Sequence, residues 1–113
     1  MTTPEPDLGN SSGGKQMLLE IQCLPSPLGV DGDHYQHIEA AIAVIERSGL
    51  TYEVGALGTT VEGEPDQIWA LSRAVHEATL ASGADSCVSI IKVAQSRLVE
   101  DAATIDSLTS KFR

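Results

Sequence analysis

The hydrophobic period of this chain changes from that of a strand to that of a helix, and it does so twice. From Met17 to Leu24 apolar side chains alternate with polar ones, which is typical of a half-buried strand. In the next segment, up to about Ser48, apolar residues recur at helical spacing, at Tyr35, Ile38, Ala41, Ile42 and Ile45. We therefore predict a strand followed by an amphipathic helix.

Local signals mark the ends of these two elements. Pro25 and Pro27 should stop the strand, because proline has no N–H to donate to a sheet. Asp33 precedes the helical stripe and Gln36 lies three residues further on, which predicts a capping box. Gly49 follows the last apolar position, and glycine readily adopts the left-handed conformation that ends a helix.

The second half of the chain repeats the pattern after a hairpin. TYEVGAL and TTVEG, within residues 51–63, indicate two short strands that should pair antiparallel because so few residues join them. Glu64 and Pro65 open a second helix that ends at Gly83 and carries inward Ile68, Leu71, Val75 and Ala78. SCVSIIKV, residues 86–93, is an almost continuous apolar run. It predicts a last strand that is buried on both faces or that contacts another subunit.

The order strand, helix, strand, strand, helix, strand predicts an α+β fold of the ferredoxin-like βαββαβ class, a four-stranded antiparallel sheet with two helices on one face. A weaker apolar stripe predicts an additional C-terminal helix, through Leu98, Ala102, Ile105, Leu108 and Phe112. We expect residues 16–113 to form this single domain. Residues 1–15, which are polar and rich in Gly, Pro and Ser, are expected to form a disordered tail.

In such a fold the second face of the sheet has no helix to cover it. Leu24 and part of the last strand should lie on that face, and apolar residues of this kind seldom stay in contact with water. We therefore expect a homo-oligomer that forms through sheet faces or sheet edges. The C-terminal helix has no evident place in the core and could pack on a neighbouring subunit.

The charge of the chain narrows the classes of partner. The formal net charge is −9 at pH 7, whereas nucleic-acid backbones and anionic membranes select basic surfaces. No apolar run approaches the length that spans a membrane. Cys23 and Cys87 show no metal-ligand spacing, so we interpret them as buried thiols in a reducing cytoplasm. A neutral or cationic small ligand therefore fits better than nucleic acid or a membrane.

Several polar residues should gather on the uncovered sheet face. The first and third strands are central neighbours in this fold, so Glu20 and Gln22 should lie beside Thr60 and Glu62. Carboxylates there could bind an amine or a delocalised cation, with Lys92 on the last strand as a counter-charge. The same residues could instead be solvated sheet positions or an ion-pair network between subunits.

Signals for catalysis, metal binding or ring stacking are sparse. His34 and His37 are three residues apart, but no third ligand is near, and we expect both to be solvated. His76 is expected to be a hydrogen-bonded packing residue. Tyr35, beside a glycine-containing loop, is the aromatic residue best placed to stack on a ligand, or else it belongs to the core. Since the chain has neither a Gly-x-Ser-x-Gly turn nor a phosphate loop, we predict that it is not an enzyme.

Several segments together resemble the thiamine-binding protein family. They are PLG after the first strand, Tyr35 at the helix start, SGLTYEVGALGTTVEG across the hairpin, His76 in the second helix, and SGADSCVSIIKV at the last strand. The resemblance covers roughly residues 17–97, and the GTTVEG stretch is its most specific part. The chain departs from the family pattern at VDGDH, before Tyr35, and at Ala94 and Gln95.

The resemblance implies a small cytoplasmic ferredoxin-like protein that forms homodimers or homotetramers. It implies binding of thiamine or its pyrimidine moiety, without turnover and without a cofactor, in a pocket near the sheet edge and the subunit interface. The matched ligand-binding positions are Thr59, Glu62 and Gly63 in the hairpin and Lys92 in the last strand. A second hypothesis is an oligomeric regulatory or protein-interaction module that has no thiamine ligand.

Overall fold

The computed structural model describes residues 16–98 and 103–113, so the predicted disordered tail 1–15 and Ala102 lie outside the described residues. The chain forms, in order, β1 (Met17–Ser26), α1 (Gln36–Ser48), β2 (Thr51–Val54), β3 (Thr59–Gly63), α2 (Pro65–Ser82), β4 (Ser86–Gln95) and α3 (Ile105–Thr109), followed by a short 3₁₀ turn at Ser110–Phe112. The predicted element order is therefore confirmed.

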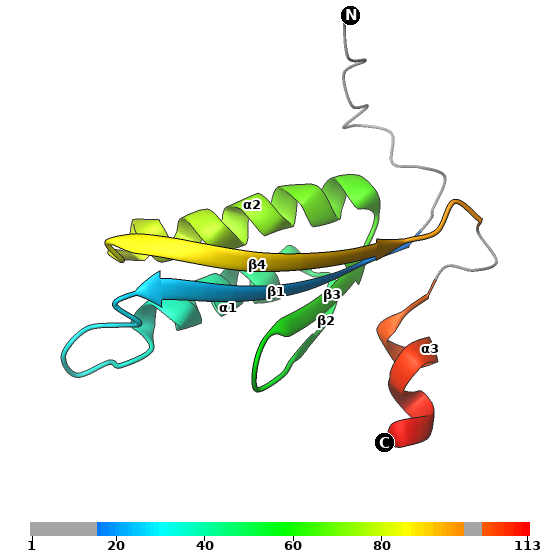
Figure 1. Cartoon of the computed structure of the whole chain (residues 1–113), viewed down its shortest axis with the longest axis horizontal. Helices are drawn as coiled ribbons and strands as arrows, with labels where there is room; N and C mark the ends of the chain where they lie inside the picture. The colour runs from blue at the N-terminus through cyan, green and yellow to red at the C-terminus, as the bar shows by residue number, and fades with distance from the viewer. Residues whose placement is uncertain (1–15, 99–102) are drawn as a thin grey trace, which may run out of the picture.

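The four strands form one antiparallel sheet in the order β2-β3-β1-β4. Both long helices, α1 and α2, cover the same face of this sheet (Figure 1). This is the predicted ferredoxin-like α+β arrangement. As predicted, Glu20 in β1 lies beside Thr60 in β3, and Lys92 in β4 lies on its other side. Glu62 lies opposite Leu18 instead, and Gln22 has no partner in β3, so that part of the prediction is wrong. We refer to the sheet face away from α1 and α2 as the open face.

The hydrophobic core lies between the sheet and the two helices. Side chains at odd positions of β1 and β3 point into it, because successive side chains of a strand alternate between faces. The buried cluster consists of Met17, Leu19, Ile21, Ala41, Ile45, Val61, Ile68, Leu71 and Val75. Even positions, including Glu20, Gln22 and Glu62, therefore face the open side.

The start of α1 differs from the sequence prediction. Tyr35, and not Asp33, is the residue before the first helical turn, and no side chain caps it. Asp33 belongs to a tight turn with Val30, in which Gly32 has φ +88°. The Asp33 carboxylate does not cap the helix but lies near Glu39. Its negative charge raises the pKa of the Glu39 carboxyl group.

The core face of α1 also begins two residues later than predicted. Tyr35 is 57% exposed, so the hypothesis that it belongs to the core is wrong. His37, expected to be solvated, is 1% exposed and lies between α1 and the end of α2. The reason is that α1 begins only at Gln36, so Tyr35 lies before the first turn, whereas His37 lies four residues before Ala41 on the buried stripe of the helix.

The other helix ends agree with prediction. Gly49 has φ +76° and Gly83 has φ +122°, values that glycine adopts without steric strain. At the start of α2, Glu64 and Gln67 form a capping box around Pro65. None of the helices among the described residues has the length and apolar character needed to cross a membrane.

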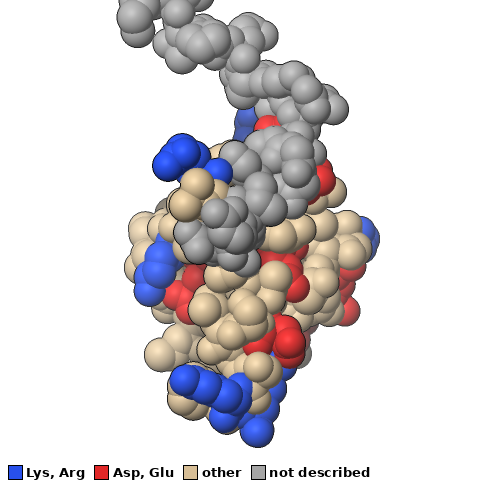
Figure 2. All heavy atoms as spheres, turned by 90° about the vertical axis from the view of Figure 1, so that its right-hand side faces the viewer, with Lys and Arg blue, Asp and Glu red and all other residues tan. Residues whose placement is uncertain are grey.

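Two predictions about the last elements need correction. The chain itself does not bury β4 on both faces, since Val88 is 61% exposed on one face and Ile91 is 43% exposed on the other. The alternative, contact with another subunit, stays a prediction. The C-terminal helix begins only at Ile105, not at Leu98, and it lies against β3 of its own chain. Seen from the side on which α3 lies, basic atoms gather at the lower edge of the molecule and acidic atoms lie above them (Figure 2).

Candidate functional site

The sheet has a notch at one edge, where the β2–β3 hairpin is shorter than β1. Pairing between β1 and β3 ends at Ile21 and Thr59, whereas pairing between β1 and β4 continues to Ser26 and Ser86. Gln22 to Ser26 therefore have β4 on one side and no described strand on the other. Their backbone N–H and C=O groups on that side are free to bind a ligand.

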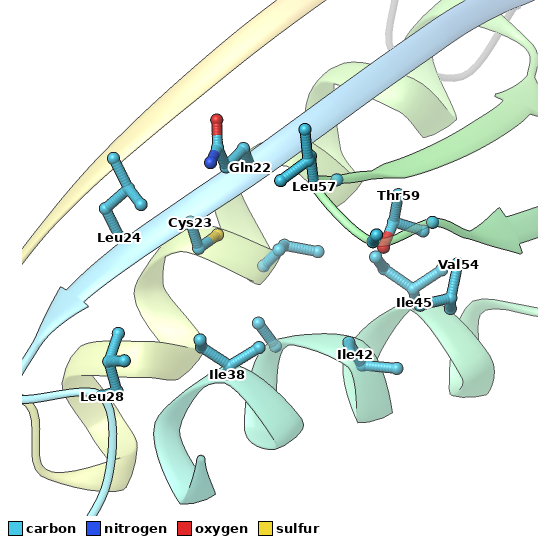
Figure 3. Close-up of a pocket in the computed structure, with 15 residues that line it drawn as sticks. Gln22, Cys23, Leu24, Leu28, Ile38, Ile42, Ile45, Val54, Leu57 and Thr59 are labelled. Carbon is cyan, nitrogen blue, oxygen red and sulfur yellow. The ribbon is translucent and has the colours of Figure 1, made fainter. Parts of the chain in front are cut away.

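A cavity of about 270 Å³ lies behind this notch, between β1 and α1. The loop Gly55–Gly58, which joins β2 and β3, forms one wall. The remaining wall is mostly aliphatic and includes Leu28, Ile38, Ile42, Ile45, Val54 and Val75. Ile38 and Ile42 point from α1 toward the sheet, and Leu28 closes one end (Figure 3). The cavity is thus suited to an apolar ring.

Two polar side chains point into this aliphatic space. Cys23 projects from β1 and Thr59 projects from the start of β3, both toward α1, whereas Gln22 points to the opposite side of the sheet (Figure 3). Thr59 is 6% exposed. Because Thr59 lies opposite Ile21, Cys23 is two residues further along the neighbouring strand and on the same face. The two groups therefore face the cavity from adjacent strands.

Cys23 contacts a chain of hydrogen-bonded side chains from β4 and α2. Ser89, opposite Cys23 in β4, donates from Oγ to Cys23 Sγ at 3.4 Å. The same oxygen lies 2.6 Å from Nδ1 of His76 in α2, and Cys87 Sγ is 3.8 Å from it. Burial raises the pKa of the Cys23 thiol, and the neighbouring Cys87 adds to this. Cys23 is therefore a neutral thiol at pH 7.

Of the five ligand-binding positions predicted from the sequence, Thr59 lies in this cavity. Glu62 and Gly63 lie together at the other end of β3, in a polar hollow near Gln67 and Thr104. Glu62 points to the open face, where its Oε2 accepts the backbone N–H of Ile105 at 3.1 Å. A ligand in the cavity thus meets Thr59 but not Glu62.

Lys92 and Tyr35 lie at two further places. Lys92 Nζ is 3.6 Å from Glu20 Oε1 on the open face, and both side chains are largely exposed, so this ion pair adds little stability. Tyr35 lies in a surface hollow of the loop before α1, beside His34. Leu28 lines both that hollow and the cavity. The structure therefore brings together only Glu62 and Gly63 among the five.

Sequence reasoning did not identify Cys23, Ser89 or α1 residues such as Ile42 as parts of a site. Cys23 was interpreted only as a buried thiol, although its odd position in β1 already placed it on the helix face. His76 was expected to be a hydrogen-bonded packing residue, and its contact with Ser89 agrees with this. The partner across the sheet was the missing information, because Cys23 and Ser89 are 66 residues apart.

The two histidines near α1 do not form a metal site. His37 is buried and its Nδ1 lies 2.7 Å from Ser82 Oγ, whereas His34 is exposed in the loop. Within residues 16–98 and 103–113, no three His, Cys, Asp or Glu side chains lie close enough together to hold a metal ion.

Solved structures share this fold. A domain of unknown function from Bacillus cereus superposes with a TM-score of 0.75 at 30% identity, over 88% of this chain and 92% of that one. A Thermotoga maritima protein assigned provisionally to thiamine biosynthesis or salvage superposes with a TM-score of 0.72 at 28% identity, over 87% of this chain and 99% of that one.

Comparison of the sequence also finds relatives. The UPF0045 protein of Clostridium perfringens is 30% identical over 95 residues, which cover 84% of this chain and 95% of the relative. A UPF0045 protein of Synechocystis is 33% identical over 78 residues, covering 69% and 64% respectively. The family model described as Thiamine-binding protein matches residues 20–111. The chain therefore belongs to the thiamine-binding protein family.

Proposed function

We propose that this protein binds thiamine or its pyrimidine moiety without turning it over, and that the aminopyrimidine ring occupies the cavity behind the sheet notch. The observation that carries the proposal is the cavity itself, an aliphatic space with two polar side chains, Cys23 and Thr59, in a member of the thiamine-binding family. Small-molecule sites are commonly apolar spaces of this kind, with a few polar groups that orient the ligand.

The size of the cavity supports a single substituted ring. A dry cavity of about 150 Å³ is enough to hold benzene, and this cavity measures about 270 Å³. The faces of an aminopyrimidine would contact the aliphatic side chains of α1. Its amino group and ring nitrogens would meet Thr59 and the unpaired backbone of β1 at Gln22 to Ser26.

The charge distribution supports an orientation in which the ring points inward and the cation outward. No Asp, Glu, Lys or Arg side chain is among the described residues that line the cavity, and burying an unpaired cation there would be costly. Glu20 lies near Gly58 but on the open face of the sheet, since a Cβ at Gly58 would lie 3.5 Å from Glu20 Cγ. The thiazolium of thiamine would therefore remain outside the cavity, in water.

The other positions predicted from the sequence lie outside the cavity. Ligand binding by Tyr35, Glu62, Gly63 and Lys92 stays a prediction, and Glu62 would need to reach the ligand from the far end of β3 or from a second copy. Gly63 has a packing reason of its own, because a Cβ there would lie 3.1 Å from Leu50 Cδ1. An alanine variant at Glu62 or Lys92 that lowers affinity would support a contribution from the open face.

Titration calorimetry with hydroxymethylpyrimidine and with thiamine tests the proposal. Thr59→Val keeps the shape of the side chain and removes its hydroxyl, so the Kd should rise roughly fivefold, the value of about 1 kcal/mol for one hydrogen bond. Thr60→Val is the matched control, because Thr60 is the next residue of β3 and faces the open side. It should leave the Kd unchanged.

Two results would contradict the proposal. Absence of heat with both ligands in the unchanged protein would favour the alternative of an oligomeric regulatory or protein-interaction module. Conversion of the ligand during incubation, detected by chromatography, would show an enzyme. A cytoplasmic location is also proposed, because the half-buried Cys23 and Cys87 are both free thiols and a reducing compartment preserves such thiols.

A further inference from the structure

We propose that the Cys23 thiol is the hydrogen-bond donor that recognises an acceptor atom on the rim of the bound ring, and that Ser89 and His76 hold the thiol in that role. The inference rests on the proposed function and deepens it. It names the group that distinguishes a nitrogen heterocycle from a plain aromatic ring of the same shape.

Ser89, His76 and Cys23 have few hydrogens to donate in their contacts with one another. A serine hydroxyl has one hydrogen, and Ser89 Oγ donates it to Cys23 Sγ at 3.4 Å. This arrangement requires the tautomer of His76 in which Nδ1, 2.6 Å from the same oxygen, carries the hydrogen and donates it. Ser89 does not use the thiol hydrogen of Cys23, so an acceptor in the cavity competes for it with Cys87 Sγ, which is a weak acceptor.

Cys23 is placed so that its thiol can reach a bound ligand. Its side chain points into the cavity, in a wall that is otherwise mostly aliphatic (Figure 3). Successive donors in one hydrogen-bonded chain polarise one another, so His76 and Ser89 should strengthen the weak S–H donor at its end. An acceptor nitrogen of a heterocycle in the cavity would complete the chain.

The protonation state of Cys23 is consistent with a donor. Burial raises the pKa of this thiol, so it remains neutral at pH 7 and cannot act as an anionic acceptor. The titratable groups that face it are Cys87 from β4 and, through Ser89, His76 from α2. Cys87 is not among the described residues that line the cavity, but it contacts Ser89 and so belongs to the same group of side chains.

Calorimetry with a matched pair of ligands tests the inference. The pair is hydroxymethylpyrimidine and its benzene isostere, in which both ring nitrogens are replaced by C–H. The unchanged protein should prefer the pyrimidine by about tenfold, because a site that offers a hydrogen bond rejects the analogue that cannot accept it. Cys23→Ala should reduce the preference to less than about threefold, whereas Cys23→Ser, which restores a donor, and Thr60→Val, on the open face, should both keep it.

Two further measurements test how Ser89 and the protonation of Cys23 contribute. Ser89→Ala should reduce the preference for the pyrimidine while the isostere binds as before. The affinity of the unchanged protein for hydroxymethylpyrimidine should fall as the pH rises through the raised pKa of Cys23, because the thiolate has no hydrogen to donate. Cys23→Ser should not show this fall, since its hydroxyl does not ionise in that range.

Alkylation provides a check that does not depend on the folding of the alanine variant. In Cys87→Ser protein, iodoacetamide should modify Cys23, and saturating hydroxymethylpyrimidine should slow the reaction at least fivefold. A preference that survives in Cys23→Ala, or a modification rate that the ligand leaves unchanged, would overturn the inference while the proposed function stands. Absence of binding by the unchanged protein would overturn both.

Discussion

His37 shows how strongly a single residue depends on a distant partner. It is fully buried, its Nδ1 lies 2.7 Å from Ser82 Oγ, and its Nε2 has no hydrogen-bond partner among the described residues. Its backbone N–H also donates to the carbonyl of Leu28, which lines the cavity. His37 therefore connects the start of α1 to the end of α2 through Ser82, and it positions Leu28 at one end of the proposed site.

Removing the partner of His37 should destabilise the protein. Ser82→Ala leaves the buried ring without any side-chain partner, and an unsatisfied buried polar group costs about 1–3 kcal/mol. The free energy of unfolding, measured by urea denaturation, should fall by that amount. Ser86→Ala, at an exposed serine four residues further on, should change it by less than about 0.5 kcal/mol. Equal effects of the two substitutions would show that the contact with His37 contributes no stability.

At the scale of elements, α3 differs from the other helices because it is held by few contacts. Thr104 and Ser107 form a capping box at its start, but a helix of five residues is too short to be stable alone. Its attachment consists of the buried Ile105, the hydrogen bond from Ile105 N to Glu62, and an ion pair between Arg113 and Glu53 at 2.9 Å. It should therefore be the first helix to detach.

Hydrogen exchange should detect that detachment. Ile105→Ala removes the buried side chain that anchors α3, so amides in residues 105–112 should exchange faster while those of β1 keep their protection. Leu108→Ala, on the same helix but 55% exposed, is the control and should leave exchange unchanged. Faster exchange in β1 as well would show that α3 unfolds together with the whole domain.

For the whole molecule, β4 is the feature that the single chain leaves incomplete. It is an edge strand of ten residues with apolar side chains exposed on both faces, Val88, Ile90, Ile91 and Val93. Edges of this kind pair with another strand or become covered. We propose that a second copy of the chain covers β4, in line with the homodimer or homotetramer expected from the sequence.

Native mass spectrometry of the purified protein should then report a homodimer or homotetramer. Ile90→Lys puts a charge in the exposed apolar strip and should shift the population to monomer at micromolar concentration. Leu80→Lys introduces the same charge at an exposed apolar position of α2 and should leave the assembly intact. A monomer in the unchanged protein, or equal behaviour of the two variants, would contradict this assembly.

The sequence by itself determined the element types, their order and hence the ferredoxin-like fold, because periodicity, caps and stops depend on residues a few positions apart. It also placed Glu20 beside Thr60, since strand order makes the two strands neighbours, but it did not give the register, which leaves Gln22 without a partner in β3. It was wrong about where α1 begins, because the turn that contains Asp33 precedes the helix, and so it misplaced Tyr35 and His37. Only the tertiary structure decided that the pairing of β1 with β3 ends at Ile21 and Thr59, that a cavity opens behind this notch, and that Ser89 and His76 lie next to Cys23. These features depend on strand length and on side chains that meet from distant segments, and no local pattern encodes either.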